Sequence, residues 1–265
     1  FGLLSKGDHA ITTTIEHNSV LRPLHHLAQY HGVEVDHVPF DARGFVDPDA
    51  VAARFNARTR VVAINHASNV IGTVQPVAEI GRPCWERGLR LVVDASQTAG
   101  KIPIDVQAMH VDVLAFTGHK SLMGPTGIGG MYVQEGVEIR HTRAGGTGVR
   151  SLYPAHLDEY PWRLEYGTPN VMGIAGIHAG LSWILKTGLG EIEAHEMRLL
   201  RRLADGLRGI PGVTLYCQDS LDDHIAVLIF NVDGLEAGNT GTMLDVDYNI
   251  ACRTGLHCAP RVHEQ

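Results

Sequence analysis

Two charged residues follow short apolar runs in the middle of the chain. The run 91–93 ends in the acid Asp94, and the run 111–116 ends in a polar turn that contains Lys120. Short apolar runs bounded by turn residues are typical of buried strands in parallel sheets that are covered on both faces. Ligands of such sheets bind at the carboxyl ends of the strands. We therefore expect Asp94 and Lys120 to face one pocket.

A carboxylate and a lysine at one site suit the chemistry of pyridoxal phosphate. A lysine holds the aldehyde of this cofactor as a Schiff base, and a carboxylate keeps the pyridine nitrogen protonated so that the ring accepts electrons. From these two residues alone, a helix cap at Asp94 and a solvated Lys120 remain the alternative, because most charged side chains lie at the surface. A wider pattern is needed to decide between the two.

That wider pattern is the segment DASQTAG followed by FTGHKSLMGPTGIGG. The two motifs resemble those of the cysteine desulfurases, which belong to the aminotransferase class V group of fold-type-I pyridoxal-phosphate enzymes. The resemblance runs over essentially the whole chain. It implies an α/β fold with a mostly parallel central sheet, pyridoxal 5'-phosphate as cofactor, and L-cysteine as substrate.

The resemblance also implies roles for residues that line the cofactor ring. His17 follows a predicted strand in the segment EHNS and is expected to stack on the pyridine ring, while Asn69 and Gln97 are expected near the ring hydroxyl. Each residue type has an ordinary alternative: a histidine at a helix start is often a surface group, and Asn69 beside Gly72 suits an Asx-turn.

Three further threonine and histidine residues are assigned in the same way. Thr117 and His119 are expected near the phosphate and Lys120. Thr168 lies in the segment GTPN, whose threonine in the resembling family reaches the phosphate of the neighbouring subunit. This threonine is the basis for predicting a homodimer; within one chain, the segment is simply a turn that leads into a helix.

The segment RTGLHCAP, residues 253–260, contains the cysteine that decides the reaction. It resembles the catalytic-cysteine loop of the SufS-like branch of desulfurases. His257 and Arg253 flank Cys258, and positively charged neighbours raise the thiolate fraction of a cysteine. The other cysteines are interpreted as small buried hydrophobic residues; they are Cys84, Cys217 and Cys252.

The implied reaction converts L-cysteine to L-alanine. Lys120 acts as the base at Cα, and Cys258 takes the sulfur as a persulfide that passes to an acceptor protein or a small thiol. Arg253 is a candidate for part of the contact with the substrate carboxylate. The alternatives are a selenocysteine lyase, another class V aminotransferase-like or epimerase-like enzyme, or an inactive fragment that only dimerises.

Two parts of the family pattern have no counterpart in the chain. The phosphate-binding turn of the family lies upstream of the segment that matches Phe1, and its substrate-carboxylate arginine lies downstream of the segment that matches Gln265. We therefore expect the sequence to be a fragment of a longer chain. We also expect that the fragment by itself binds the cofactor poorly.

Composition and charge limit the remaining classes of function. The 265 residues are 44% hydrophobic and 19% charged, which is typical of a soluble globular protein. A net charge of −7 and a pI near 6.1 argue against binding to nucleic acid or an anionic membrane. No CxxC spacing and no histidine ligand spacing predicts a metal site, and the cysteine usage favours a reducing cytoplasm.

Alternating strands and helices predict right-handed βαβ units in a cofactor-binding large domain at residues 1–171. A smaller α+β C-terminal domain is expected at residues 172–265. The large-domain pattern predicts strands at 9–14, 33–38, 61–65, 91–93, 111–116 and 129–133, with helices starting near 17, 47 and 77. The later pattern predicts helices at 171–186, 191–208 and 235–247, with strands at 213–216, 224–231 and 249–252.

Overall fold

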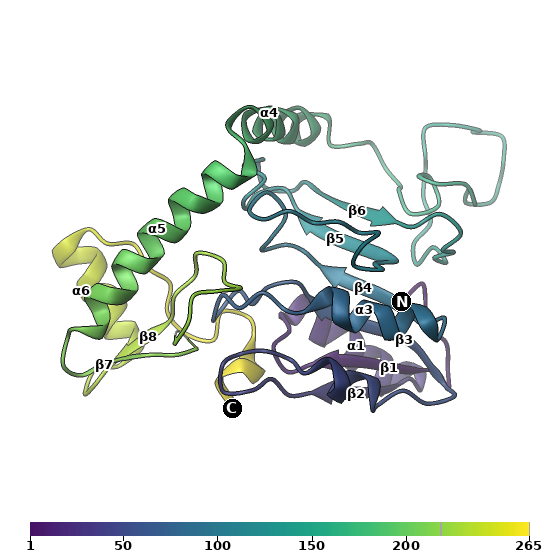
Figure 1. Ribbon diagram of the computed structural model, residues 1–265. Helices are drawn as coiled ribbons and strands as arrows, with labels where there is room; N and C mark the ends of the chain where they lie inside the picture. Colours follow the sequence, from purple (N-terminus) through teal and green to yellow (C-terminus); the bar gives the residue numbers. More distant parts are fainter. Residues whose placement is uncertain (218, 265) are drawn as a thin grey trace.

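The computed structural model describes residues 1–217 and 219–264. The strands of the large sheet are β1 (His9–Thr13), β2 (Glu34–Val38), β3 (Thr59–Asn65), β4 (Arg90–Asp94), β5 (Val113–Thr117) and β6 (Gly129–Val133). Their order is β2-β1-β3-β4-β5-β6, in which every neighbouring pair is parallel except β5 and β6 (Figure 1). The predicted mostly parallel sheet is confirmed.

The helices between these strands cover both faces of the sheet. They are α1 (Asn18–His31), α2 (Pro48–Ala52) and α3 (Val77–Glu86). Val61 and Ala63 of β3 pack with Leu24 and Leu27 of α1. The alternate β3 residues, among them Ile64, pack with α2 and α3 on the other face. Because successive side chains of a strand point to opposite faces, burial on both faces requires the uninterrupted apolar runs seen in the sequence.

Local capping fixes where two of the helices begin. Asp47 precedes α2, accepts a hydrogen bond from the backbone N–H of Asp49, and is followed by Pro48 in the first helical position. This cap begins α2 where the sequence predicts a helix, near residue 47. His17 precedes α1 in extended conformation, and its side chain accepts a hydrogen bond from the backbone N–H of Ser19.

A second part of the fold follows a long irregular segment. It consists of α4 (Val171–Thr187), α5 (Leu189–Arg208), β7 (Val213–Leu215), β8 (Phe230–Val232), α6 (Ala237–Tyr248) and a 3₁₀ helix (Pro260–Glu264). Figure 1 shows α5 running obliquely from α4 to the small antiparallel sheet of β7 and β8. α4 itself lies against the loop that follows β5, so a domain boundary at 171/172 stays a prediction.

Two predicted strands of the C-terminal part are wrong. The strand expected at 224–231 is reduced to β8, because the preceding residues contact a loop of the large domain: the Ile225 N–H donates to the Gly72 carbonyl at 2.8 Å, and His224 bridges to Thr73. The segment 249–252 contains no strand, because Asn249 takes a left-handed conformation that ends α6.

Across residues 1–217 and 219–264, none of the helices combines the length and the apolar character that a membrane-spanning helix needs.

Candidate active site

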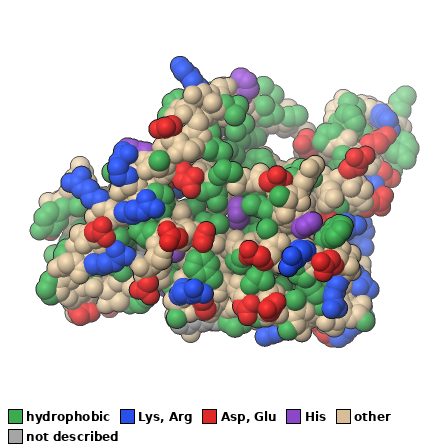
Figure 2. All heavy atoms as spheres, viewed as in Figure 1, with side chains coloured by type: hydrophobic (Ala, Val, Ile, Leu, Met, Phe, Trp, Pro, Cys, Tyr) green, Lys and Arg blue, Asp and Glu red, His purple; other side chains and the backbone are tan. Residues whose placement is uncertain are grey.

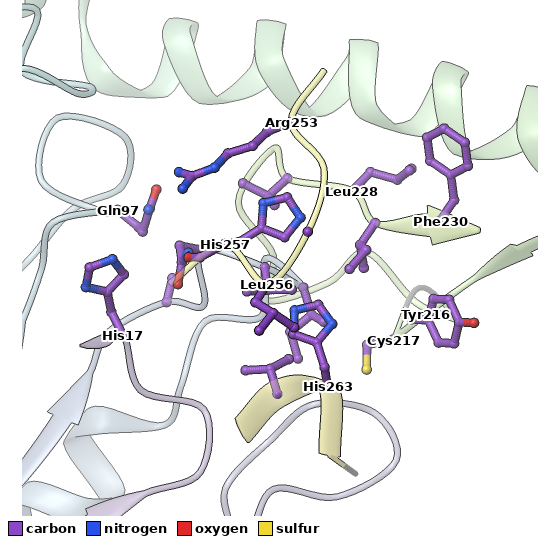
Figure 3. A pocket seen from close by; sticks show the side chains of 18 of the residues that line it. His17, Gln97, Tyr216, Cys217, Leu228, Phe230, Arg253, Leu256, His257 and His263 are labelled. Carbon is purple, nitrogen blue, oxygen red and sulfur yellow. The ribbon is translucent and has the colours of Figure 1, made fainter. Parts of the chain in front are cut away.

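A cavity of about 1530 Å³ lies at the carboxyl ends of β3, β4 and β5, where the large sheet faces β7, β8 and α6. Eight of the predicted site residues line it: His17, Asn69, Asp94, Gln97, Thr117, His119, Lys120 and Arg253. Figure 3 shows the side chains of His17, Gln97 and Arg253 facing the same open region. The large domain and the C-terminal part both contribute to this cavity.

Asp94 and Lys120 meet in this cavity as expected from the strand ends. Asp94 is the last residue of β4, and β4 pairs in parallel with β5, which leads into the turn carrying Lys120. The Asp94 carboxylate accepts a hydrogen bond from the Ser96 N–H at 2.9 Å and one from the Ser19 hydroxyl at 3.4 Å. Within the described residues, no salt bridge of 4.0 Å or less joins Asp94 to Lys120.

The surroundings of Lys120 favour its neutral amine. Burial lowers the pKa of Lys120, the Asp94 carboxylate opposes that shift, and the Arg253 guanidinium adds to it. A lowered pKa increases the fraction of uncharged amine, which is the form that attacks a carbonyl or accepts a proton.

His17 presents a neutral imidazole to the cavity. Burial lowers the pKa of His17, and the Lys120 cation lowers it further. Its Nδ1 accepts the Ser19 N–H at 3.0 Å, so the proton of the neutral ring lies on Nε2. A neutral ring fixed by a helix cap is well suited to packing against an aromatic ligand.

Behind the cavity lies Glu16, a buried acid that the sequence analysis did not single out. Its carboxyl group accepts hydrogen bonds from the Thr13 hydroxyl at 2.7 Å and the Asn65 N–H at 3.0 Å. Burial raises the pKa of Glu16 to about 8, against the effect of these bonds. Glu16 is thus protonated at neutral pH.

Glycines hold the turn that carries Lys120 in place. A side chain at Gly118 would approach Ile128 Cγ2 to 2.6 Å, so the turn closes tightly only without one. Gly180 of α4 lies in contact with the backbone carbonyl of Leu122, and Gly176 lies against Pro125. Three glycines at spacings of three and four residues in α4, with Gly173 as the first, were the sequence signal for this close contact.

The residues of the cavity fit pyridoxal phosphate. Thr117 Oγ1 and Asn69 Oδ1 are buried and have no hydrogen-bond partner in the described part of the chain. Buried polar atoms are normally paired, so a polar ligand that satisfies them after a small side-chain rotation is favoured. A carboxylate for a pyridine nitrogen, an amine for an aldehyde and a neutral imidazole for a ring face are all present in the same cavity.

Cys258 is exposed on a turn next to the cavity, although it is not among the described residues that line it. Its neighbours Leu256 and His257 do line the cavity. The Arg253 guanidinium donates a hydrogen bond to the Cys258 sulfur, with Nη2 and Sγ 3.6 Å apart. The thiol is therefore accessible and has a cationic neighbour.

Only one of the other three cysteines is buried as the sequence predicts. Cys84 is buried as expected, and burial raises the pKa of its thiol to about 12. Cys252 is exposed and Cys217 is half-buried, so their interpretation as buried residues is wrong. Both line the cavity because the C-terminal part presents its inner surface to the large domain.

Thr168 does not belong to the cavity of its own chain. It is exposed in the turn before α4, outside the residues that line the cavity. A role toward a neighbouring subunit stays a prediction. Ser19, Ser96 and Asn65 line the cavity but were missed; their only sequence signal is that they lie within a few residues of strand ends.

The sequence matches the family Aminotransferase class-V over residues 2–265. The chain belongs to this family. A relative described as a probable cysteine desulfurase, from Pyrococcus abyssi (strain GE5 / Orsay), is 37% identical over 261 residues, which are 97% of this chain and 64% of the relative. This class V chain therefore spans about 64% of the length of that curated relative.

Solved structures give the same result for the fold of this class V chain. The apo structure of a cysteine desulfurase from Thermococcus onnurineus NA1 matches with a TM-score of 0.89 and 36% identity, over 98% of this chain and 66% of that one. A mutant of C-DES with glycine covalently linked to its PLP cofactor matches with a TM-score of 0.86 and 26% identity, over 99% of this chain and 74% of that one. The predicted family and fold type are confirmed.

Proposed function

We propose that this chain contains the catalytic centre of a pyridoxal-phosphate-dependent cysteine desulfurase, which converts L-cysteine to L-alanine and takes the sulfur as a persulfide on Cys258. The observation that supports the proposal best is the placement of Lys120 and Asp94 in one cavity, with an exposed thiol beside it. The similarity to cysteine desulfurases over 97% of the chain agrees with this proposal.

The chain's own residues would hold the cofactor at three points. Lys120 would bind its aldehyde carbon, Asp94 the protonated pyridine nitrogen, and His17 the face of the ring. Asn69, Gln97, Thr117 and His119 supply polar groups around it. When bound, pyridoxal phosphate supplies an electron sink for the charge that develops at the substrate Cα.

Lys120 would transfer the proton at Cα, and Cys258 would accept the sulfur. Once the substrate amine has replaced it at the cofactor aldehyde, the neutral amine of Lys120 would take the Cα proton of the substrate, and its lowered pKa favours that form. The Cys258 thiolate would attack the sulfur of L-cysteine: the substrate's Cβ–S bond breaks, and an S–S bond forms on Cys258. Cβ gains a proton, and the proton held by Lys120 returns to Cα to give L-alanine. Arg253 donates a hydrogen bond to the Cys258 sulfur and is positioned to attract the substrate carboxylate.

Exposed apolar side chains support the proposed homodimer. Leu152, Met172 and Leu185 have exposed fractions of 101%, 82% and 82%. Figure 2 shows hydrophobic side chains gathered over α4 and over the segment before it, which contains Thr168. Exposed apolar patches of this kind commonly mark protein–protein interfaces.

The four cysteines are free thiols, which suits the proposed cytoplasmic location. An acceptor protein or a small thiol would remove the sulfur from the exposed Cys258. The acceptor's approach requires no opening of the core, because Cys258 is already at the surface.

The proposed function is tested with the protein that contains this chain, supplied with pyridoxal phosphate and L-cysteine. We expect equal amounts of alanine and of sulfide released by a reductant, and a Cys258 peptide heavier by one sulfur atom before reduction. Cys258→Ser should abolish all three, whereas Cys252→Ser, which removes another exposed thiol of the cavity, should retain them. Undiminished sulfide release by Cys258→Ser would contradict the proposal.

A further inference from the structure

Asn69 connects the cavity to the loop that carries Cys258. It lies after β3 and lines the cavity, and its side-chain Nδ2 donates a hydrogen bond to the backbone carbonyl of His257 at 2.7 Å. His257 immediately precedes Cys258 in the chain. A side chain of the large domain therefore holds the backbone of the cysteine loop.

A second hydrogen bond anchors the same loop. The Asn18 N–H, in the first turn of α1, donates to the backbone carbonyl of Cys258 at 2.7 Å. Between the two anchors the backbone is unusual, because His257 and Cys258 both have left-handed φ angles, of 51° and 59°. Such conformations cost energy in non-glycine residues and persist only where the surroundings hold them. The two donated hydrogen bonds are among the contacts that hold this backbone, together with the stacking of His257 on His263.

The Asn69 amide has hydrogen-bonding capacity beyond this contact. A primary amide has two N–H bonds and one carbonyl oxygen, and the His257 carbonyl uses one N–H. The oxygen is buried and unpartnered among the residues described by the structure. The second N–H of the amide can donate to a ring hydroxyl in the cavity while the first N–H stays on the loop.

We propose that Asn69 couples the cofactor cavity to the Cys258 loop, so that a ligand hydroxyl bound in the cavity and the docked loop stabilise each other through one amide. Asn69 is thus a positioning residue for Cys258. By linkage, any ligand that orders Asn69 tightens the loop, and a docked loop raises the affinity for that ligand by the same factor. The choice of pyridoxal phosphate as that ligand rests on the proposed function. The hydrogen bond between Asn69 and His257 is independent of that function.

The loop contact is tested by hydrogen–deuterium exchange with mass spectrometry on the cofactor-free protein. In Asn69→Ala and in Asn69→Asp, which keeps the shape but removes the donor, we expect peptides covering 253–259 to exchange about three- to tenfold faster, as suits the loss of one hydrogen bond. Asn231→Ala is the matched control, because Asn231 lines the same cavity but donates to the Tyr216 hydroxyl. Equal exchange in the Asn69 variants and the control would overturn the proposal.

The coupling is tested by adding pyridoxal phosphate, with binding followed separately by visible absorbance. We expect the cofactor to slow exchange of the loop several-fold in the wild type and in Asn231→Ala, and to leave it unchanged in Asn69→Ala. A cofactor that binds the wild type without slowing the loop would overturn the coupling. A cofactor that fails to bind at all would contradict the proposed function and the cofactor half of the coupling, while the loop contact is decided by the cofactor-free measurement alone.

Discussion

Lys120 and Asp94 line one cavity, yet no salt bridge of 4.0 Å or less joins them in the part of the chain that the structure describes. Their charges still interact, because the Asp94 carboxylate raises the pKa of Lys120 against the larger effect of burial. An amine and a carboxylate held apart in this way leave room for a ring that binds both.

The two charged neighbours of Lys120 should shift its pKa in opposite directions. Asp94→Asn removes the carboxylate that raises the pKa, so the pKa of Lys120 should fall further. Arg253→Gln removes a cation that lowers the pKa, so the pKa of Lys120 should rise. Trace acetylation of the cofactor-free protein across a pH series, read at the Lys120 peptide, measures both shifts.

Lys186, which is exposed on α4, serves as the reference amine in each sample of that series. Its acetylation profile should be the same in all three proteins. Shifts of Lys120 in the same direction for both variants would contradict the electrostatic description of the cavity.

Glu16 should make the protein less stable as the pH rises. Its folded-state pKa of about 8 exceeds the ordinary value of 4.5, so between these values the unfolded chain releases a proton that the folded chain keeps. The free energy of unfolding should therefore decrease with pH across this window. Glu16→Gln is neutral at every pH. The decrease of its free energy of unfolding with pH should therefore be smaller by the contribution of up to one proton, and the variant should be more stable than the wild type near pH 8.

Urea unfolding of both proteins at several pH values between about 5 and 8 gives the two slopes. The comparison cancels the contributions of histidines and of other acids, which both proteins share. Parallel slopes for wild type and Glu16→Gln would show that Glu16 is ionised in the folded protein.

The contact between α4 and the Lys120 loop should not accept a methyl group at Gly180. Its added carbon would meet the Leu122 carbonyl and the backbone of Met123, so Gly180→Ala should destabilise the protein by about 1–3 kcal/mol. Gly206→Ala in α5 meets nothing within 4 Å and should be neutral or stabilising by up to about 1 kcal/mol. Thermal unfolding of both variants measures these differences. Equal stability of Gly180→Ala and Gly206→Ala would contradict the close contact.

The strands that end at the cavity could be predicted because both faces of the sheet are buried. β3 and β4 contain the apolar runs 61–64 and 91–93 for that reason, and the polar residue at the end of each run then faces the ligand side. Asp94 and the Lys120 turn followed directly from this rule. The family motifs added His17, Asn69 and Gln97, all of which line the cavity.

The C-terminal part was harder to predict because its apolar residues pack on distant segments. The apolar run within 224–231 resembles a buried strand, but Ile225 is buried against the loop around Gly72. The burial of Glu16 was hard to predict for a similar reason: the Thr13 bond is local, but the Asn65 N–H reaches Glu16 only through the pairing of β1 and β3. Local pattern does not contain these contacts.

The most direct test of the central claim is the visible spectrum of the purified protein with added pyridoxal phosphate. If Lys120 binds the cofactor aldehyde, an absorbance band at about 420 nm should appear and should be lost in Lys120→Ala, while the surface control Lys186→Ala keeps it. A band of equal intensity in Lys120→Ala would contradict the assignment of Lys120 as the cofactor lysine.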